Sequence, residues 1–300
     1  MRINFPLFTK PWILAARPKT LLAALSPVLL GGAFALADEL FSPIPFVLAL
    51  LCSLLFQILA NFANDYFDGV KKIDQEDRLG PPRMVAMGMI QPRSMIIAIA
   101  LLICLLVVLG VLLFLNSGWP VVVIGLAAIL SAIFYSGGPL PYASRALGDV
   151  FAFVFFGPVA VLGSYFVQAH NLNASAGLAS LGTGLWITAI LVVNNYRDRK
   201  GDKQVGKYTM AVILGEKKSR CYFYLLLGLS FLVPPGLLLR GHSLFVFLPY
   251  IILPLAVKLA KDFRETRGRG LNLILARTSF LGFVYTTLLA LAVLFEHFSR

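Results

Sequence analysis

Long apolar stretches alternate with short polar segments along almost the whole chain. Each stretch is close to the roughly 20 residues that an α-helix needs to cross a hydrocarbon core about 30 Å thick. Outer-membrane strands would alternate apolar and polar positions instead, and the run from Val121 to Leu130 does not. The pattern predicts an all-α polytopic membrane protein in which residues 1–300 form a single domain. Its nine predicted transmembrane helices lie at about 11–37, 44–65, 94–115, 119–136, 146–168, 178–197, 221–239, 243–260 and 279–297.

Composition excludes an ordinary soluble enzyme. Hydrophobic residues make up 59% of the chain, charged residues only 13%, and the mean hydropathy is +0.84, which leaves too little polar material to cover a soluble surface. The net charge of +12 alone is compatible with nucleic acid, a basic soluble domain or anionic lipid. Only the placement of the charges along the chain can decide among these.

Basic residues concentrate in alternate connections between the predicted spans. Of the 26 Lys and Arg residues, 24 fall in 1–20, 66–93, 137–145, 197–220 and 258–277. By the positive-inside rule, these segments are cytoplasmic, the N-terminus is inside and the C-terminus is outside. The chain is therefore expected in the inner (plasma) membrane, with lipid rather than nucleic acid around it and its active site on the cytoplasmic side. No obligate protein partner is evident.

The second predicted span ends in a polar face. Its polar residues are Gln57, Asn61, Asn64, Asp65 and Asp68, whose spacing places them along one side of a helix. Facing lipid with such a stripe would be costly. We expect it to face the inside of the bundle or a wet cavity.

The sixth predicted span ends in a similar cluster. Asn194, Asn195, Arg197 and Asp198 are followed by Asp202, and the two aspartates are four residues apart, so they share a face if the helix continues. Two such clusters at the cytoplasmic ends of two spans indicate that the same type of polar site occurs twice. The alternative is that each is only a solvated helix end.

Carboxylate and amide oxygens suit a hard divalent ion, and Mg²⁺ is usually held by one or two carboxylates together with substrate phosphates. Arg and Lys would neutralise the remaining phosphate oxygens, although most basic residues are expected only to orient the protein. A membrane cavity beneath the site would accept an apolar tail. The clusters therefore favour an enzyme acting on a lipid diphosphate.

These residues resemble the UbiA superfamily of intramembrane aromatic prenyltransferases, and within it the MenA branch. The ordered motifs that carry the resemblance are Ala16-Arg17-Pro18-Lys19-Thr20-Leu21, Asn64-Asp65-Tyr66-Phe67-Asp68-Gly69, Asp74, Asp77-Arg78, Gly80-Pro81, Gly137-Gly138-Pro139, Leu147-Gly148-Asp149, Asn194-Asn195-Tyr196-Arg197-Asp198, Asp202, Gly206-Lys207 and Thr209. The superfamily's first motif commonly places its third acid at position 72, which is Lys72 here, and the next acid is Asp74. Whether Asp74 or Asp77 is a ligand therefore stays open.

The resemblance implies a bundle of nine helices around a central cavity, with Mg²⁺ between the two aspartate motifs. The metal ligands it implies are Asp65, Asp68, Asp198 and Asp202. Polar residues expected to assist catalysis are Asn61, Asn64, Asn194, Asn195 and Arg197. Diphosphate contacts are expected from Arg78, Arg145 and Lys207, as well as from Arg197.

The implied reaction transfers a polyprenyl group from polyprenyl diphosphate to 1,4-dihydroxy-2-naphthoate, with loss of CO₂ and diphosphate, and gives demethylmenaquinol. Arg17 and Lys19 are candidates for the acceptor's carboxylate, with packing or lipid anchoring equally open. Tyr66 and Tyr135 are candidates to shield an allylic cation. Two alternatives remain, namely another aromatic acceptor (4-hydroxybenzoate, homogentisate or a tetrapyrrole) and an anion transporter. Transporters place polar groups near the bilayer midplane, whereas these carboxylates gather at helix ends.

Overall fold

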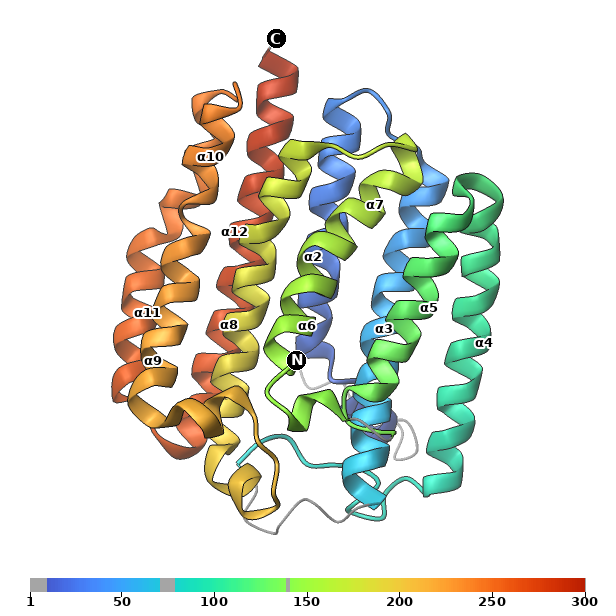
Figure 1. Cartoon of the computed structure of the whole chain (residues 1–300), viewed down its shortest axis with the longest axis vertical. Coiled ribbons are helices and arrows are strands. Elements are labelled where there is room, and N and C mark those ends of the chain that lie inside the picture. The colour runs from blue at the N-terminus through green and yellow to red at the C-terminus, as the bar shows by residue number, and fades with distance from the viewer. Residues whose placement is uncertain (1–9, 71–78, 139–140, 300) are drawn as a thin grey trace.

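The computed structural model describes residues 10–70, 79–138 and 141–299, except for the side chain of Lys19. This part of the chain is almost entirely helical (Figure 1). In chain order the elements are α1 (Lys10–Ala16), α2 (Pro18–Ala37), α3 (Pro43–Val70), α4 (Pro92–Ser117), α5 (Trp119–Phe134), η1 (Tyr142–Ser144), α6 (Gly148–Val154), η2 (Phe155–Val159), α7 (Ala160–Ala169), α8 (Ala174–Gln204), α9 (Met210–Ser230), α10 (Val233–Leu239), η3 (Leu244–Ile252), α11 (Leu253–Glu265), η4 (Gly268–Gly270) and α12 (Leu271–Ser299). The all-α prediction is confirmed.

Eight helical segments in the described ranges are long and apolar enough to cross a membrane. They match eight of the predicted spans. The remaining span corresponds to α5, which is apolar but has 16 residues, just short of the usual 17–25. The count of nine spans therefore stays a prediction.

Large apolar side chains cover the outside of the bundle, as lipid contact requires. On α4, Leu101, Val108 and Leu115 are all exposed. A soluble protein rarely exposes such a continuous apolar surface. The chain is an integral membrane protein.

The helices form two groups joined by a central layer (Figure 1). The helices α3, α4 and α5 pack together on one side, and α9 to α12 pack on the other, with α2, α6, α7 and α8 between them. The largest apolar core lies around α8 and α12, where Trp186 and Tyr285 are buried in contact. A smaller core joins α3, α4 and α5.

A π-helical turn, η2, interrupts the segment between α6 and α7. It contains Pro158, which cannot donate to the helical hydrogen-bond ladder. Beside it, a Cβ on Gly157 would lie only 2.9 Å from the carbonyl oxygen of Ser180 and 3.0 Å from Cα of Gly184. Glycine at both positions lets this segment approach the backbone of α8.

The ends of α3 and α8 lie at the same end of the bundle, at the bottom of Figure 1, whereas α12 ends at the top. At that opposite end, close to the end of α12, His242 Nδ1 lies 2.9 Å from Glu296 Oε2. Because α3 and α8 end on the same side of the bundle, the two predicted carboxylate clusters lie together at one end of the molecule. Which side of the membrane this end faces stays a prediction.

Candidate functional site

A cavity of about 720 Å³ lies inside the bundle and is lined mainly by residues of helices α2 to α8. Polar side chains from the ends of α3 and α8 line one part of it: Asn61, Asn64, Asp68, Asn194, Asn195, Arg197, Asp198 and Asp202. Farther along the helices the lining is apolar and includes Phe56, Leu106, Leu113, Val121, Ile124, Phe155 and Val159. The same cavity therefore joins a charged region to an apolar one.

On α3, Asn64 and Asp68 are one helical turn apart and both line the cavity. Asp68 Oδ2 accepts a hydrogen bond of 2.5 Å from Nη2 of Arg83, and both side chains are buried. Asn64 is 8% exposed, and its Oδ1 has no hydrogen-bond partner among the described residues. A buried oxygen of this kind is costly unless a ligand satisfies it.

Asp65 is buried and lies outside the cavity lining. Its Oδ1 accepts from the backbone N–H of Val85 at 2.9 Å, and its Oδ2 accepts from that of Met84 at 3.0 Å. The approach is close because Gly69 has no side chain, since a Cβ there would lie 2.9 Å from Cβ of Val85. Asp65 thus holds the segment that carries Arg83, and its role as a direct metal ligand stays a prediction.

On α8, Asp198 and Asp202 both line the cavity. Arg197 donates to both carboxylate oxygens of Asp198, from Nε at 2.8 Å and from Nη2 at 2.7 Å. It also donates to Oδ1 of Asn194 at 2.8 Å. A bidentate pair of this kind fixes the orientation of the carboxylate.

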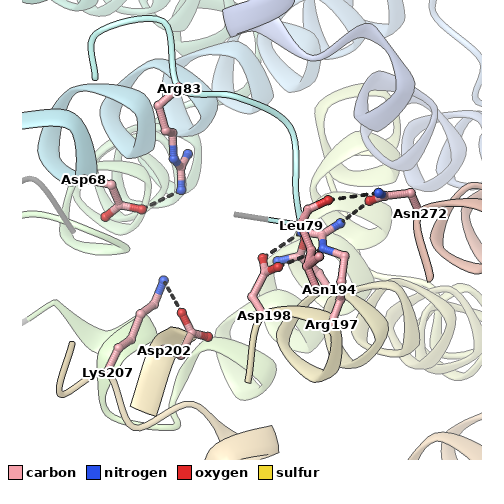
Figure 2. A network of polar contacts seen from close by, with 9 residues as sticks. All are labelled: Asp68, Leu79, Arg83, Asn194, Arg197, Asp198, Asp202, Lys207 and Asn272. Atoms are coloured by element: carbon pink, nitrogen blue, oxygen red, sulfur yellow. Dashed lines mark hydrogen bonds and ion pairs between the residues drawn. The ribbon is translucent and has the colours of Figure 1, made fainter. Parts of the chain in front are cut away.

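Arg197 also connects distant parts of the chain, as Figure 2 shows. Its Nη1 donates to Oδ1 of Asn272 on α12 at 2.8 Å. Asn272 Nδ2 in turn donates to the carbonyl oxygen of Leu79 at 2.9 Å. This chain of contacts ties α12 and the segment after α3 to the site.

The connection after α8 supplies a further cation. Lys207 Nζ lies 3.9 Å from Oδ1 of Asp202, and the backbone N–H of Lys207 donates to the carbonyl oxygen of Asp202 at 2.8 Å. Next to it, the N–H of Tyr208 donates to the carbonyl oxygen of Ser144 at 3.0 Å. Lys207 is therefore held at the cavity by contacts on both sides.

The acids lie on opposite sides of an open centre in Figure 2, with Asp68 on one side and Asp198 and Asp202 on the other. Within the described ranges, no three His, Cys, Asp or Glu side chains converge closely enough to hold a metal by themselves. The atoms available to a metal are the carboxylate oxygens of these acids and the buried Oδ1 of Asn64. They fit Mg²⁺, which takes a few protein carboxylates and completes its coordination with phosphate and water.

A break between α1 and α2 brings Arg17 to the cavity. Arg17 adopts the left-handed conformation, with φ of 51°, and the following Pro18 disfavours a helical residue before it. Asn61 holds the break by donating to the carbonyl oxygen of Ala16 at 2.9 Å and to Oγ1 of Thr20 at 3.0 Å. Asn61 is thus a positioning residue for this part of the wall.

Aromatic rings form the wall next to the charged region. Tyr135, Tyr142 and Phe151 all line the cavity, and the rings of Tyr142 and Phe151 stack with centroids 4.1 Å apart. Burial raises the pKa of Tyr142 to about 12. The hydroxyl therefore stays protonated and donates to the carbonyl oxygen of Ser131 at 2.7 Å.

Some predicted residues lie elsewhere. Arg145 is exposed and lies outside the cavity lining, and Tyr66 packs against Phe67 rather than lining it. Asn195 lines the cavity, and its Nδ2 lies 3.5 Å from Oδ1 of Asp149. The positions outside the described part of the chain are Asp74, Asp77, Arg78 and the side chain of Lys19.

Sequence reasoning gave no role to Arg83, Tyr142, Lys200 or Asn272. Arg83 and Lys200 are basic residues near the two acidic clusters, so nearness in sequence was the available signal. Asn272 is the second residue of α12, far from both motifs in the sequence. Nothing in the sequence marked it, because its role depends on how α12 packs against α8.

A profile of the UbiA prenyltransferase family matches residues 24–284. The chain belongs to this family. It is 37% identical over 278 residues to the 1,4-dihydroxy-2-naphthoate octaprenyltransferase of Escherichia coli, with 90% of each chain covered. It is 34% identical over 289 residues to the enzyme of the same name from Mycobacterium tuberculosis, with 96% of this chain and 98% of that one covered.

Solved structures of UbiA homologues share the fold. The homologue from Archaeoglobus fulgidus bound to GPP and Mg²⁺ has a TM-score of 0.68 at 15% identity, covering 95% of this chain and 99% of that one. The homologue from Aeropyrum pernix has a TM-score of 0.67 at 15% identity, covering 89% and 98%. At this level of identity the likeness concerns the fold alone.

Proposed function

We propose that this protein transfers a polyprenyl group from polyprenyl diphosphate to 1,4-dihydroxy-2-naphthoate. The products are demethylmenaquinol, CO₂ and diphosphate. The observation that carries the proposal is the continuity of one cavity from acids and cations to an apolar interior, which matches a substrate with an anionic head and a hydrocarbon tail. The names of the bacterial relatives support the choice of acceptor.

Asp68, Asp198 and Asp202 would hold Mg²⁺ together with the diphosphate, with Oδ1 of Asn64 beside them. When bound, the ion supplies stabilisation of the negative charge that develops on the leaving diphosphate. Asp65 contributes indirectly in this proposal, by fixing the segment that carries Arg83.

The chain's own cations would take the outer phosphate oxygens. Lys200 and Lys207 line the charged part of the cavity, and so does Arg83, which is also paired with Asp68. Arg197 is already engaged with Asp198, Asn194 and Asn272, so its main part is to orient the carboxylate and amide beside the diphosphate. Preorganised charges of this kind favour departure of the leaving group.

Transfer breaks the bond between the allylic carbon and the diphosphate oxygen, and the electron pair leaves with diphosphate. The ring carbon that carries the carboxylate forms the new bond to the allylic carbon. Loss of CO₂ returns the electron pair of the bond between the ring and the carboxylate to the ring. The negative charge that the carboxylate carried is then accounted for by the extra negative charge on the released diphosphate. The faces of Tyr135, Tyr142 and Phe151 would shield the electron-deficient allylic carbon, and the apolar wall would exclude water that would otherwise capture it.

Arg17 is the candidate partner for the acceptor's carboxylate, because the break between α1 and α2 places it at the cavity wall. Lys19 is the second candidate from the same motif. The basic connections of the sequence favour a cytoplasmic position for this end of the bundle and insertion in the plasma membrane.

The deciding experiment uses isolated membranes that contain the protein, a radiolabelled polyprenyl diphosphate and 1,4-dihydroxy-2-naphthoate labelled in its carboxylate. We expect prenylated product and labelled CO₂ in equal amounts, both abolished by a chelator and restored by Mg²⁺. Parallel reactions with 4-hydroxybenzoate and homogentisate test the alternative acceptors. Turnover with one of these and none with the naphthoate would contradict the proposed acceptor, and turnover that persists under chelation would contradict the metal role.

A further inference from the structure

Three glycines on three different helices line the apolar part of the cavity. They are Gly110 on α4, Gly125 on α5 and Gly163 on α7. Apart from its chain neighbours and its own helix backbone, a Cβ built on any of them meets no heavy atom of the described residues within 4 Å. A side chain at these positions would therefore enter open space.

The helical spacing shows that this open space belongs to the cavity. Gly110 lies on the stripe of α4 that carries Leu106 and Leu113, both of which are buried and line the cavity. Gly125 follows the buried Val121 by four residues on α5, and Gly163 precedes Val167 by four on α7. Residues three or four apart share a helix face.

The three glycines also lie at similar heights in the bundle, a few residues from the end where α4 meets α7. Asn116 Nδ2 and Ser117 Oγ both donate to the carbonyl oxygen of Val167, at 2.9 and 3.1 Å, so the end of α4 is level with Val167. Gly163 and Gly110 are four and about six residues from this level, or roughly 6 and 9 Å at 1.5 Å per residue. Gly125 lies at a similar distance beyond the start of α5, which follows α4 directly.

Neither a turn nor helix packing accounts for these glycines. None of them has a positive φ, and each is inside a helix, where glycine costs about 0.5–1 kcal/mol relative to alanine. Gly31 and Gly157 are different, since a Cβ at either would come within 3 Å of a neighbouring helix. The lack of a side chain at Gly110, Gly125 and Gly163 therefore keeps space open in the cavity.

We propose that Gly110, Gly125 and Gly163 form a glycine ring that admits the distal isoprene units of a long prenyl donor, and so determine the chain length that the enzyme accepts. This rests on the proposed function. In the charged part of the same cavity, the buried Oδ1 of Asn64 has no hydrogen-bond partner among the described residues, which leaves it available to a bound ion, water or head group there.

The position of the ring predicts which donors it affects. On α5, Gly125 is ten residues from Tyr135 in the charged part, or about 15 Å at 1.5 Å per residue. The first isoprene unit beyond the diphosphate therefore does not reach the ring. A side chain at the ring blocks long donors and spares short ones.

The test replaces each ring glycine by leucine and compares kcat/KM for geranyl, farnesyl, geranylgeranyl and octaprenyl diphosphates in membranes. We expect kcat/KM for octaprenyl diphosphate to fall by about 10–100-fold, the range for small steric changes in an apolar pocket, while that for geranyl diphosphate stays within about threefold. All three variants should lose activity at donor lengths within about one isoprene unit of each other, because the glycines lie at similar heights by the helix rise of about 1.5 Å per residue.

The matched control is Gly228→Leu on α9, where a Cβ also meets no heavy atom within 4 Å but the residue lies outside the cavity lining. It should change no donor preference. Where a leucine variant is not recovered in membranes, the alanine variant of the same position gives a smaller loss confined to long donors. Equal losses for all donor lengths, or undiminished use of octaprenyl diphosphate, would overturn the inference. Absence of prenyl transfer by the unaltered protein with every donor would instead contradict the proposed function.

Discussion

The ends of α3 and α8 carry the same kinds of residue, asparagine followed by aspartate, but they use them differently. On α8, both aspartates line the cavity, and Arg197 of the same helix holds Asp198. On α3, Asp68 lines the cavity, whereas Asp65 binds the backbone of the following segment. That segment returns Arg83 to pair with Asp68.

The difference shows how the two sites obtain their cations. The α8 end is largely built within one helix, so its carboxylate and its Arg come together when the helix forms. The α3 end depends on a loop that must be anchored first, and one of its carboxylates does the anchoring. A pair of similar motifs therefore does not imply a pair of equivalent ligand sets.

The largest effect is expected where the two ends act alike. Asp68→Asn and Asp198→Asn should each lower turnover by about 10³-fold or more, because each removes a charge that would act on the leaving diphosphate. Turnover is measured in membranes after the amount of folded protein has been equalised. Asp262→Asn is the control, since Asp262 pairs with Arg277 at 2.9 Å outside the cavity. Near-normal turnover in either site variant would contradict the claim that both aspartates act on the diphosphate.

The next effect tests the dependence of the α3 end on its loop. Arg83→Ala leaves a buried carboxylate without its cation, and loss of one partner of a buried pair costs about 3–5 kcal/mol of folding stability. We expect a lower thermal midpoint in detergent and a rise in KM for the prenyl diphosphate, both partly restored in Arg83→Lys. An unchanged KM and midpoint for Arg83→Ala would show that Asp68 does not need this cation.

Asp65→Asn separates anchoring from metal binding. The amide keeps one acceptor but faces a backbone N–H with its own NH₂ group, and an unsatisfied buried donor costs about 1–3 kcal/mol of unfolding free energy. The thermal midpoint should therefore fall, while the dependence of turnover on Mg²⁺ concentration stays close to that of the unaltered protein. A normal midpoint combined with a large shift in the Mg²⁺ requirement would make Asp65 a ligand.

The smallest effect concerns the outer cations. Lys207→Ala should raise KM for the diphosphate by only a few-fold, because it removes one of several cations that line the charged part of the cavity, and its distance of 3.9 Å from Asp202 shows that it is held loosely. Arg145→Ala, at an exposed position outside the lining, should leave KM unchanged. A larger effect from Arg145 than from Lys207 would reverse this order.

The helices and the two polar faces were predictable because both follow from local periodicity. Apolar runs of membrane length specify spans, and the spacing of Asn61, Asn64 and Asp68 specifies one face. The direction of Asp65 was not predictable in the same way. Asp65 is adjacent to Asn64 in the sequence, but successive residues are about 100° apart around a helix. Asp65 therefore contacts the segment at Met84 and Val85, and helical spacing does not predict where that segment runs.

The sequence by itself determined that this is a helical membrane protein, that two aspartate clusters lie at helix ends and that the chemistry favours a diphosphate. Tertiary structure alone decided that Arg83 pairs with Asp68, that Asn272 supports Arg197 and that three glycines from three helices line one cavity. The physical reason is the range of the interactions. Hydropathy and helical spacing act over a few turns, whereas a cavity wall exists only after helices far apart in the chain have packed together.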